Sequence, residues 1–454
     1  MCSPNVGHCY APGPCYGALG LNHPSKSALD RARPGSVSAF VERFAHLFRV
    51  ATPGQLDAGF ASLGSFLIQL LVLRTFTATE IGAYAFAYTG LTMAALIPAS
   101  LVFAPYELKA IEYDEASRLD LLRSSFPPGL LAAALAGFVL VAASVPAMGQ
   151  VPSSFFLGLV ATAWLAMVAS VIQDHVRRMA HIGSRSWVAA GMSGVYLVSA
   201  ATGFVILNSS PPQSWAPFGV MLTANLLGLG FFVVARGARG KLEGRLPIAE
   251  LRRIGGWLLI GSAGIAVGGF VSMFIIERIV GLDSVGHIEA ARVVGRPVQV
   301  IGLGLLAVVA PRIMTAASSR DVATAARWSR FYWIVLGSVA GLFTVALLWP
   351  VITDELRSLL PVAFIVPLLA VVTAPTSAMA VADVPIRAEL LGYRGQLGIA
   401  RGSLIGAGAQ VLASLLAIWI GAMAGPVAAG VGGLASLLVM AWYLRKARGE
   451  AVDE

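Results

Sequence analysis

The chain has 454 residues, of which 57% are hydrophobic and only 12% charged, and its mean hydropathy is +0.78. A soluble domain carries about 25% charged residues, so this composition excludes a soluble globular protein and requires lipid as the solvent. The net charge of +9 is spread over short segments between apolar runs, which excludes nucleic acid as its cause and indicates membrane topology and attraction to anionic lipid.

The first 48 residues differ from the rest because they are rich in Pro, Gly and Ser and contain no long apolar run. They lack the hydrophobic region of a signal peptide, so we expect residues 1–48 to form a disordered cytoplasmic tail. Cys2, Cys9 and Cys15 all lie here, and with His8 they match no strong zinc spacing. We therefore expect no metal site, and no disulfide in the membrane-embedded part.

Beyond the tail, the chain contains a series of apolar runs, each long enough to cross a bilayer as a helix of roughly 20 residues. Long continuous runs favour helices over a β-barrel, whose strands would alternate in polarity. The fold class expected is therefore an all-α membrane protein with twelve transmembrane helices. The spans are predicted at about 54–74, 81–105, 127–147, 154–173, 187–207, 216–235, 254–277, 291–311, 331–351, 359–381, 402–421 and 424–444.

The distribution of Lys and Arg predicts how these spans are oriented. With the N-terminus inside, 27 of the 32 basic residues fall in or beside cytoplasmic segments. Such a bias is the usual mark of cytoplasmic loops. We therefore expect a multi-pass protein of the cytoplasmic (plasma) membrane with both termini in the cytoplasm.

An internal repeat relates the first pair of spans to the seventh and eighth at an offset of 204 residues. "VLRTFTATEIGAYAFA" places Arg74 eight positions before Gly82, and "IERIVGLDSVGHIEAA" places Arg278 eight positions before Gly286. With six spans in each half, the repeat predicts two pseudo-symmetric six-helix bundles and a substrate path at their interface. The expected division is a bundle at 49–236, a basic linker at 237–253, a second bundle at 254–445 and a cytoplasmic tail at 446–454.

Polar residues inside the spans are the candidates for function. In "HIEAARVVGRPVQV" (287–300), helical spacing places Glu289, Arg292, Arg296 and Gln299 on one face. Arg296 lies about 24 Å above the cytoplasmic end of its helix at 1.5 Å per residue, so it is at membrane depth. A guanidinium there either reaches the outer phosphates or faces a wet cavity, and Pro297 could give the helix a hinge.

Three further charged residues belong to this set of candidates. Arg74 and Arg278 end their helices at the outer interface, where they either satisfy the last carbonyls or bind substrate. Asp57, at the start of the first span, either suits the helix dipole or couples transport to an ion. The candidate substrate-binding residues are thus Arg292, Arg296, Gln299, Arg74 and Arg278, and the candidate ion-coupling residue is Asp57.

Several catalytic and nucleotide-binding patterns are missing from the sequence. "GARGKLEG" fails the phosphate-binding loop pattern at the first glycine and at the final hydroxyl, and no H-E-x-x-H occurs. No pair of carboxylates at membrane depth suits glycosyl transfer. We therefore expect no enzyme, no catalytic residues and no cofactor, which leaves transport.

The stretch "QLDAGFASLGSFLIQLLVLRTFTATEIGAYAFAYTGL" resembles the first two helices of polysaccharide flippases of the multidrug/oligosaccharidyl-lipid/polysaccharide exporter superfamily. "GLDSVGHIEAARVVGRPVQVIGLGLLAVVAPR" is similar to the junction of their seventh and eighth helices. The resemblance implies a V-shaped pair of bundles with a cationic cavity for a diphosphate, which would suit Arg292 and Arg296. This chain has few charges deep in its first bundle.

The resemblance implies a flippase that moves a polyprenyl-diphosphate-linked oligosaccharide across the cytoplasmic membrane for cell-surface polysaccharide synthesis. Its partners would be the lipid-linked glycan, membrane lipids, and the glycosyltransferases and polymerase of the same pathway. Two alternatives remain open at this point. One is a cation-coupled multidrug antiporter of the same superfamily, and the other is a non-transporting membrane scaffold for glycan-assembly enzymes.

Overall fold

The computed structural model describes residues 37–110, 113, 115–183, 185–236, 246–359, 365–393 and 395–453. The first half contains α2 (Val37–Thr75), α3 (Ala78–Pro98), the π-helix η1 (Ala99–Phe103), α4 (Ala104–Ala110), α5 (Glu115–Ser124), α6 (Phe126–Ser144), η2 (Val145–Ala147), α7 (Ser153–Ile182), α8 (Ser186–Leu207) and α9 (Ala216–Arg236). The second half contains α10 (Ile248–Val280), α11 (Leu282–Ser318), α12 (Val322–Leu348), α13 (Pro350–Leu359), α14 (Pro367–Met379), α15 (Val384–Gly392), α16 (Gln396–Ser414), α17 (Ala417–Ile420), η4 (Gly421–Met423) and α18 (Ala424–Asp453).

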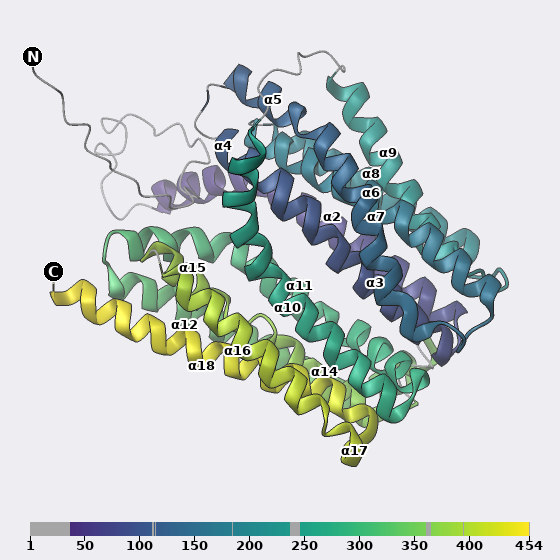
Figure 1. Cartoon of the computed structure of the whole chain (residues 1–454). Coiled ribbons are helices and arrows are strands. Elements are labelled where there is room, and N and C mark those ends of the chain that lie inside the picture. Colours follow the sequence, from purple (N-terminus) through teal and green to yellow (C-terminus); the bar gives the residue numbers. More distant parts are fainter. Residues whose placement is uncertain are drawn as a thin grey trace, which may run out of the picture.

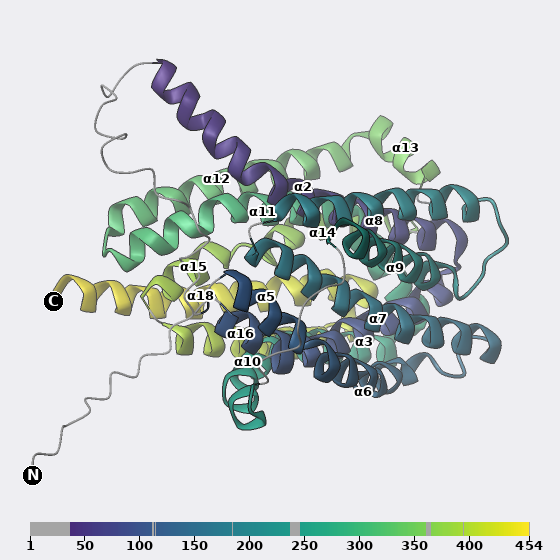
Figure 2. The same cartoon turned by 90° about the horizontal axis from the view of Figure 1, so that it is seen from above.

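The helices form two groups that spread apart as a V (Figure 1). We call α2 to α9 the N-lobe and α10 to α18 the C-lobe. The start of α2 and the end of α18 lie at the same end of the molecule, as both views show (Figures 1 and 2). The lobes converge at the opposite end, where α3 packs against α11.

The prediction of an all-α membrane protein is confirmed. Within the described residues, ten helical segments are long and apolar enough to cross a membrane, and α11, bent by 44° after Leu306, makes eleven. Large apolar side chains face outward, for example Phe138 (64% exposed), Leu342 (72%) and Leu157 (66%). A surface so rich in exposed apolar side chains requires a lipid environment.

Within the described ranges, eleven segments at most are long and apolar enough to cross, compared with the twelve spans predicted. The predicted span at 402–421 corresponds to α16 and α17, and α16 packs between α10 and α18. Arg401, Gln396 and Gln410 lower the hydropathy of α16. It is thus less apolar than the segments counted as spans, although its exposed Leu412 and Ile405 side chains also face outward.

Two boundaries of the predicted division differ from the structure. Helix α2 begins at Val37, inside the segment expected to be a disordered tail, and residues 1–36 lie outside the described residues. Helix α10 begins at Ile248, so the end of the expected linker is helical, while 237–245 lies outside the described residues.

The junction between α3 and α11 has the symmetry of the sequence repeat. A Cβ added to Gly82 would overlap the carbonyl oxygen of Leu282, and one added to Gly286 would overlap that of Ala78. Gly286 and Leu282 are each 204 residues after Gly82 and Ala78, so the two contacts are equivalent under exchange of the lobes. Exchanging every residue with its repeat counterpart turns the first contact into the second, as a two-fold axis between the lobes requires.

The axis itself passes close to Thr79 and Asp283, which are also separated by 204 residues. The Thr79 hydroxyl donates a hydrogen bond to Asp283 Oδ1, so a residue meets its own counterpart. A second polar contact joins the lobes nearby, where Gln150 Nε2 lies 2.6 Å from Glu277 Oε1. The lobes are therefore closed against each other at the end distant from the start of α2.

At the other end, α10 leaves the C-lobe and packs against η1 of the N-lobe. Gly255 makes this approach possible, because an added Cβ would lie only 2.7 Å from the Cα of Leu101. Ser100 Oγ and Ser262 Oγ lie 3.3 Å apart across the same contact. The π-helix follows Pro98, where the ordinary α-helical ladder is interrupted. Helix α10 therefore contacts both lobes.

Candidate functional site

Helix α11 presents Arg292, Arg296 and Gln299 on one face, as the spacing predicts. Arg292 Nη1 donates to Glu289 Oε2 over 2.8 Å, and its side chain remains 58% exposed while Glu289 is buried. Arg296 and Gln299 are both half-buried. The helix continues through Pro297 without a break, and the bend lies further along, after Leu306.

Arg296 lies on α11, which packs against α3 and α2 of the N-lobe. Tyr84, on α3, and Tyr196, on α8, are buried residues of that lobe. Tyr84 stacks on Tyr88 with a centroid separation of 5.8 Å and on Phe218 at 5.1 Å. Arg296 is therefore a half-buried residue of the C-lobe helix that packs against the N-lobe helix carrying Tyr84, and such partial burial is expected of an arginine that does not face lipid.

The two arginines at helix ends have different surroundings. Arg74 is exposed at the end of α2. Arg278 is 62% exposed, its Nε lies 3.3 Å from Glu277 Oε2, and its guanidinium carbon lies 5.1 Å from the Phe274 ring centroid. Glu277 thus forms an ion pair with Arg278, and Arg292 forms its ion pair with Glu289.

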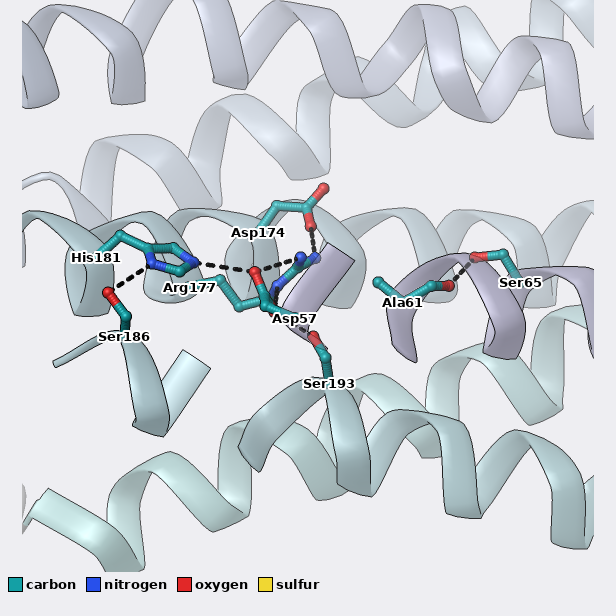
Figure 3. A network of polar contacts seen from close by, with 8 residues as sticks. All are labelled: Asp57, Ala61, Ser65, Asp174, Arg177, His181, Ser186 and Ser193. Atoms are coloured by element: carbon teal, nitrogen blue, oxygen red, sulfur yellow. Dashed lines mark hydrogen bonds and ion pairs between the residues drawn. The ribbon is translucent and has the colours of Figure 1, made fainter. Parts of the chain in front are cut away.

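Asp57 lies in a polar cluster buried between α2, α7 and α8 (Figure 3). Arg177 donates to both carboxylate oxygens, from Nε and from Nη2, over 2.9 Å each. His181 Nε2 lies 3.0 Å from Asp57 Oδ2, and the Ser193 hydroxyl donates to Oδ1 over 2.5 Å. Arg177 also reaches Asp174 at 3.1 Å. Four donors thus satisfy the Asp57 carboxylate as an anion.

This cluster predicts a large effect of Asp57→Asn on stability. The substitution leaves Arg177, whose side chain is only 20% exposed, without its bidentate partner. Removing one member of a buried pair costs roughly 3 kcal/mol. Thermal unfolding of the purified protein in detergent measures the loss.

Asp174→Asn is the matched control, because Asp174 pairs with the same guanidinium but is 51% exposed. An exposed pair contributes under about 1 kcal/mol, so this variant should unfold close to the wild-type temperature. Equal destabilisation by the two substitutions would contradict a special role for the Asp57 pair.

The sequence analysis did not single out the N-lobe tyrosines or His181. Aromatic residues are common in spans, so Tyr84 and Tyr196 gave no distinguishing pattern. The site is also free of a metal cluster as far as it is described: no group of three or more His, Cys, Asp or Glu side chains within the described ranges could hold a metal ion. The three cysteines lie before Val37, outside those ranges.

Comparison with known sequences finds nothing, since no protein-family profile and no curated protein matches the chain. Solved structures do match. An inward-facing multidrug resistance MATE family transporter of the MOP superfamily superposes with a TM-score of 0.61 and 12% identity, over 88% of this chain and 96% of that one. The outward-facing form of such a transporter gives a TM-score of 0.55, with 13% identity and coverage of 90% and 96%.

The inward closed conformation of the lipid II flippase MurJ matches equally well. Its TM-score is 0.60 at 11% identity, with coverage of 89% of this chain and 90% of that one. At such identities the likeness concerns the fold alone. The chain is a multi-pass membrane protein with the two-lobed fold of MOP-superfamily transporters.

Proposed function

We propose that the protein is a flippase that moves a polyprenyl-diphosphate-linked oligosaccharide across the cytoplasmic membrane, for cell-surface polysaccharide synthesis. The observation that carries the proposal is the position of Arg296, which is half-buried on the C-lobe helix that packs against α3 and α2 of the N-lobe. Guanidinium groups bind phosphate through a planar fork of N–H donors. Arg292, 58% exposed on the same face, supplies a second cation for a diphosphate.

The expected orientation completes the proposal. With both termini in the cytoplasm, the end where the lobes spread faces inside, and the closed α3–α11 junction faces outside. The lipid-linked glycan would enter between the lobes from the cytoplasmic side. Glycosyltransferases would supply it there, and a polymerase would use it on the outer face.

A cation-coupled multidrug antiporter is the main alternative, because MATE transporters share the fold. Such a carrier needs a carboxylate that can release its protein partner to an incoming cation. Asp57 accepts hydrogen bonds from Arg177 and Ser193 and contacts His181, so a drug cation would have to displace a bidentate guanidinium. This arrangement favours the flippase over the antiporter.

Reconstitution tests the proposal against both alternatives. The purified protein is placed in proteoliposomes that contain a fluorescent undecaprenyl-diphosphate disaccharide, and quenching from outside reports the outer-leaflet fraction over time. We expect quenching to extend to the inner-leaflet population at a rate that exceeds that of protein-free liposomes at least tenfold. Efflux of ethidium without movement of the glycolipid would support the antiporter, and neither activity would support the scaffold.

A further inference from the structure

A second polar cluster in the N-lobe surrounds His175, which sequence analysis did not select. The side chain of His175, on α7, is completely buried. Its ring stacks on Phe103 of η1 with a centroid separation of 4.0 Å, and the Phe126 ring lies edge-on at 5.4 Å. An imidazole enclosed in this way must find both of its hydrogen-bond partners within the protein.

The hydrogen bonds around Ser125 determine the state of one ring nitrogen. Ser125 Oγ lies 2.6 Å from the carbonyl oxygen of Leu122, and two oxygens at this separation require a hydrogen between them. A hydroxyl has a single hydrogen, so Ser125 can only accept from His175 Nε2, which lies 2.9 Å away. The carbonyl of Leu122 is a second acceptor, 3.4 Å from the same nitrogen. Nε2 therefore carries a proton.

The other ring nitrogen faces a carboxylate. His175 Nδ1 lies 2.9 Å from Glu107 Oε1, on α4, and this separation also requires a hydrogen between the two atoms. The hydrogen belongs either to an imidazolium or to a protonated carboxyl. The reference state is a neutral imidazole, protonated only at Nε2, beside an ionised Glu107 carboxylate. In both cases the Glu107–His175 pair holds one proton more than this reference state.

His181 lies on the same helix and shows the opposite arrangement. Its Nε2 faces Asp57 Oδ2 at 3.0 Å, while its Nδ1 faces the Ser186 hydroxyl at 3.1 Å (Figure 3). The hydroxyl can donate to Nδ1, so a neutral imidazole satisfies both contacts. The extra proton is therefore a property of His175 and is not general to the histidines of α7.

We propose that Glu107 and His175 form the proton-binding site that couples transport to a proton gradient, and that the present conformation is its loaded form. This inference rests on the proposed transport function and supplies its driving ion. A proton enters from the cytoplasmic solution, stays between Nδ1 and Oε1, and leaves the pair when the lobes exchange conformation. Once it has left, Nε2 keeps its hydrogen and its contact with Ser125, and the bare Nδ1 faces the Glu107 carboxylate with no hydrogen between them.

The charged groups around the pair leave a route for the proton. The Glu107 side chain is itself 13% exposed, so a proton can reach its carboxylate from the solvent, and Glu107 Oε2 lies 3.3 Å from Nη1 of the partly exposed Arg178. On α5, Arg118 donates to backbone carbonyls and Arg123 pairs with Asp120. The first turns of α10, which approach α4, carry Glu250 and the exposed Arg252 and Arg253.

The site is also placed to influence the lobes. Glu107 lies on α4, which continues directly from η1, and η1 carries both Phe103 and the backbone against which Gly255 of α10 packs. A change in the contact between Glu107 and His175 therefore acts on the segment that joins the N-lobe to α10 at the inner end. Proton release would loosen that contact and favour movement of α10.

Two measurements on the full-length protein in nanodiscs test the proposal without any substrate. Nitrogen-15 spectra of the histidines, recorded over a pH series, report the protonation of each ring, and His175→Gln identifies the relevant signal. Spin labels at Arg185→Cys and Ala323→Cys, with Cys2, Cys9 and Cys15 changed to Ser, report the separation of the lobes at the inner end. We expect the doubly protonated signal of His175 to disappear over the same pH interval in which the label separation changes.

Several controls make the result decisive. Glu107→Gln should abolish the pH dependence of the separation, whereas His181→Gln should remove a neutral signal and leave that of His175 in place. A His175 ring that is singly protonated in the spread conformation, or that titrates while the separation stays constant, would overturn the proposal. If Glu107→Gln fails to fold, the assigned His175 signal and the label separation in the protein with Glu107 intact still supply both readings.

The liposome assay separates this inference from the proposed function. Failure of the wild-type protein to move the glycolipid, together with the coupled titration, would refute the flippase and leave the proton site standing. If the glycolipid moves and its rate does not change with an imposed pH gradient, the proton coupling is refuted and the flippase activity is supported.

Discussion

Replacing Arg296 with alanine should reduce the rate of glycolipid movement at least about tenfold while the amount of protein in the membrane stays unchanged. Hydrogen bonds to charged groups contribute about 1.5–3 kcal/mol each, and the substitution removes the phosphate contacts of the guanidinium. Folding should tolerate the change, because Arg296 is only half-buried and the smaller side chain leaves the helix intact. The fluorescent-glycolipid assay gives the rate, and immunoblotting gives the amount.

Two further variants show whether the geometry of the guanidinium matters. Arg296→Lys keeps the charge but loses the planar fork, so its rate should lie between those of the wild type and Arg296→Ala. Arg252→Ala removes an exposed arginine at the start of α10 and should transport normally. Normal transport by Arg296→Ala would show that the diphosphate binds elsewhere.

Alanine at Gly286 should prevent the lobes from closing at the end where α3 packs against α11. Its Cβ would overlap the Ala78 carbonyl oxygen, which belongs to the backbone and cannot rotate away. Overpacking of this kind costs about 1–3 kcal/mol. Only the conformation closed at this end bears the cost, so its population relative to the conformation open at this end should fall by roughly 5–150-fold. By the repeat symmetry, Gly82→Ala should act in the same way.

Oxidative cross-linking measures this population. A disulfide between Thr79→Cys and Asp283→Cys forms only when the junction is closed, and the native cysteines are first changed to Ser. We expect rapid cross-linking in the otherwise wild-type protein and slow cross-linking once Gly286→Ala is added. Gly304→Ala is the control on the same helix, since its added Cβ would meet nothing within 4 Å. An unchanged rate with Gly286→Ala would show that the junction is not a closed contact that the lobes must form.

The parts of the fold that follow from local pattern could be predicted from the sequence. Apolar runs mark helices in lipid, and the recurrence of Arg and Gly at an offset of 204 marks a repeat. The structure adds the reason for the glycines, because Gly82 and Gly286 each admit the backbone of the other lobe. The spacing of Arg292, Arg296 and Gln299 likewise placed them on one face of α11.

Features that depend on contacts between distant segments could not be predicted. Glu107 lies 68 residues before His175, and Ser125 lies 50 residues before it. Nothing in the neighbouring sequence therefore indicates that these three side chains meet. Pro297 was expected to give its helix a hinge, but α11 continues through it and bends after Leu306. Asp57 was selected as an unusual carboxylate in a span, while the groups that contact it come from other helices. Each of these features is determined by packing between segments distant in the sequence, which a local sequence pattern does not reveal.

A cryo-EM structure of the protein with undecaprenyl diphosphate bound in nanodiscs tests most directly whether Arg296 receives the substrate. We predict density for the diphosphate between the lobes, within hydrogen-bond distance of the Arg296 guanidinium and next to Arg292, with Tyr84 and Tyr196 on the opposite side. A diphosphate bound elsewhere, with the Arg296 side chain directed into the surrounding acyl chains, would contradict the proposed mechanism.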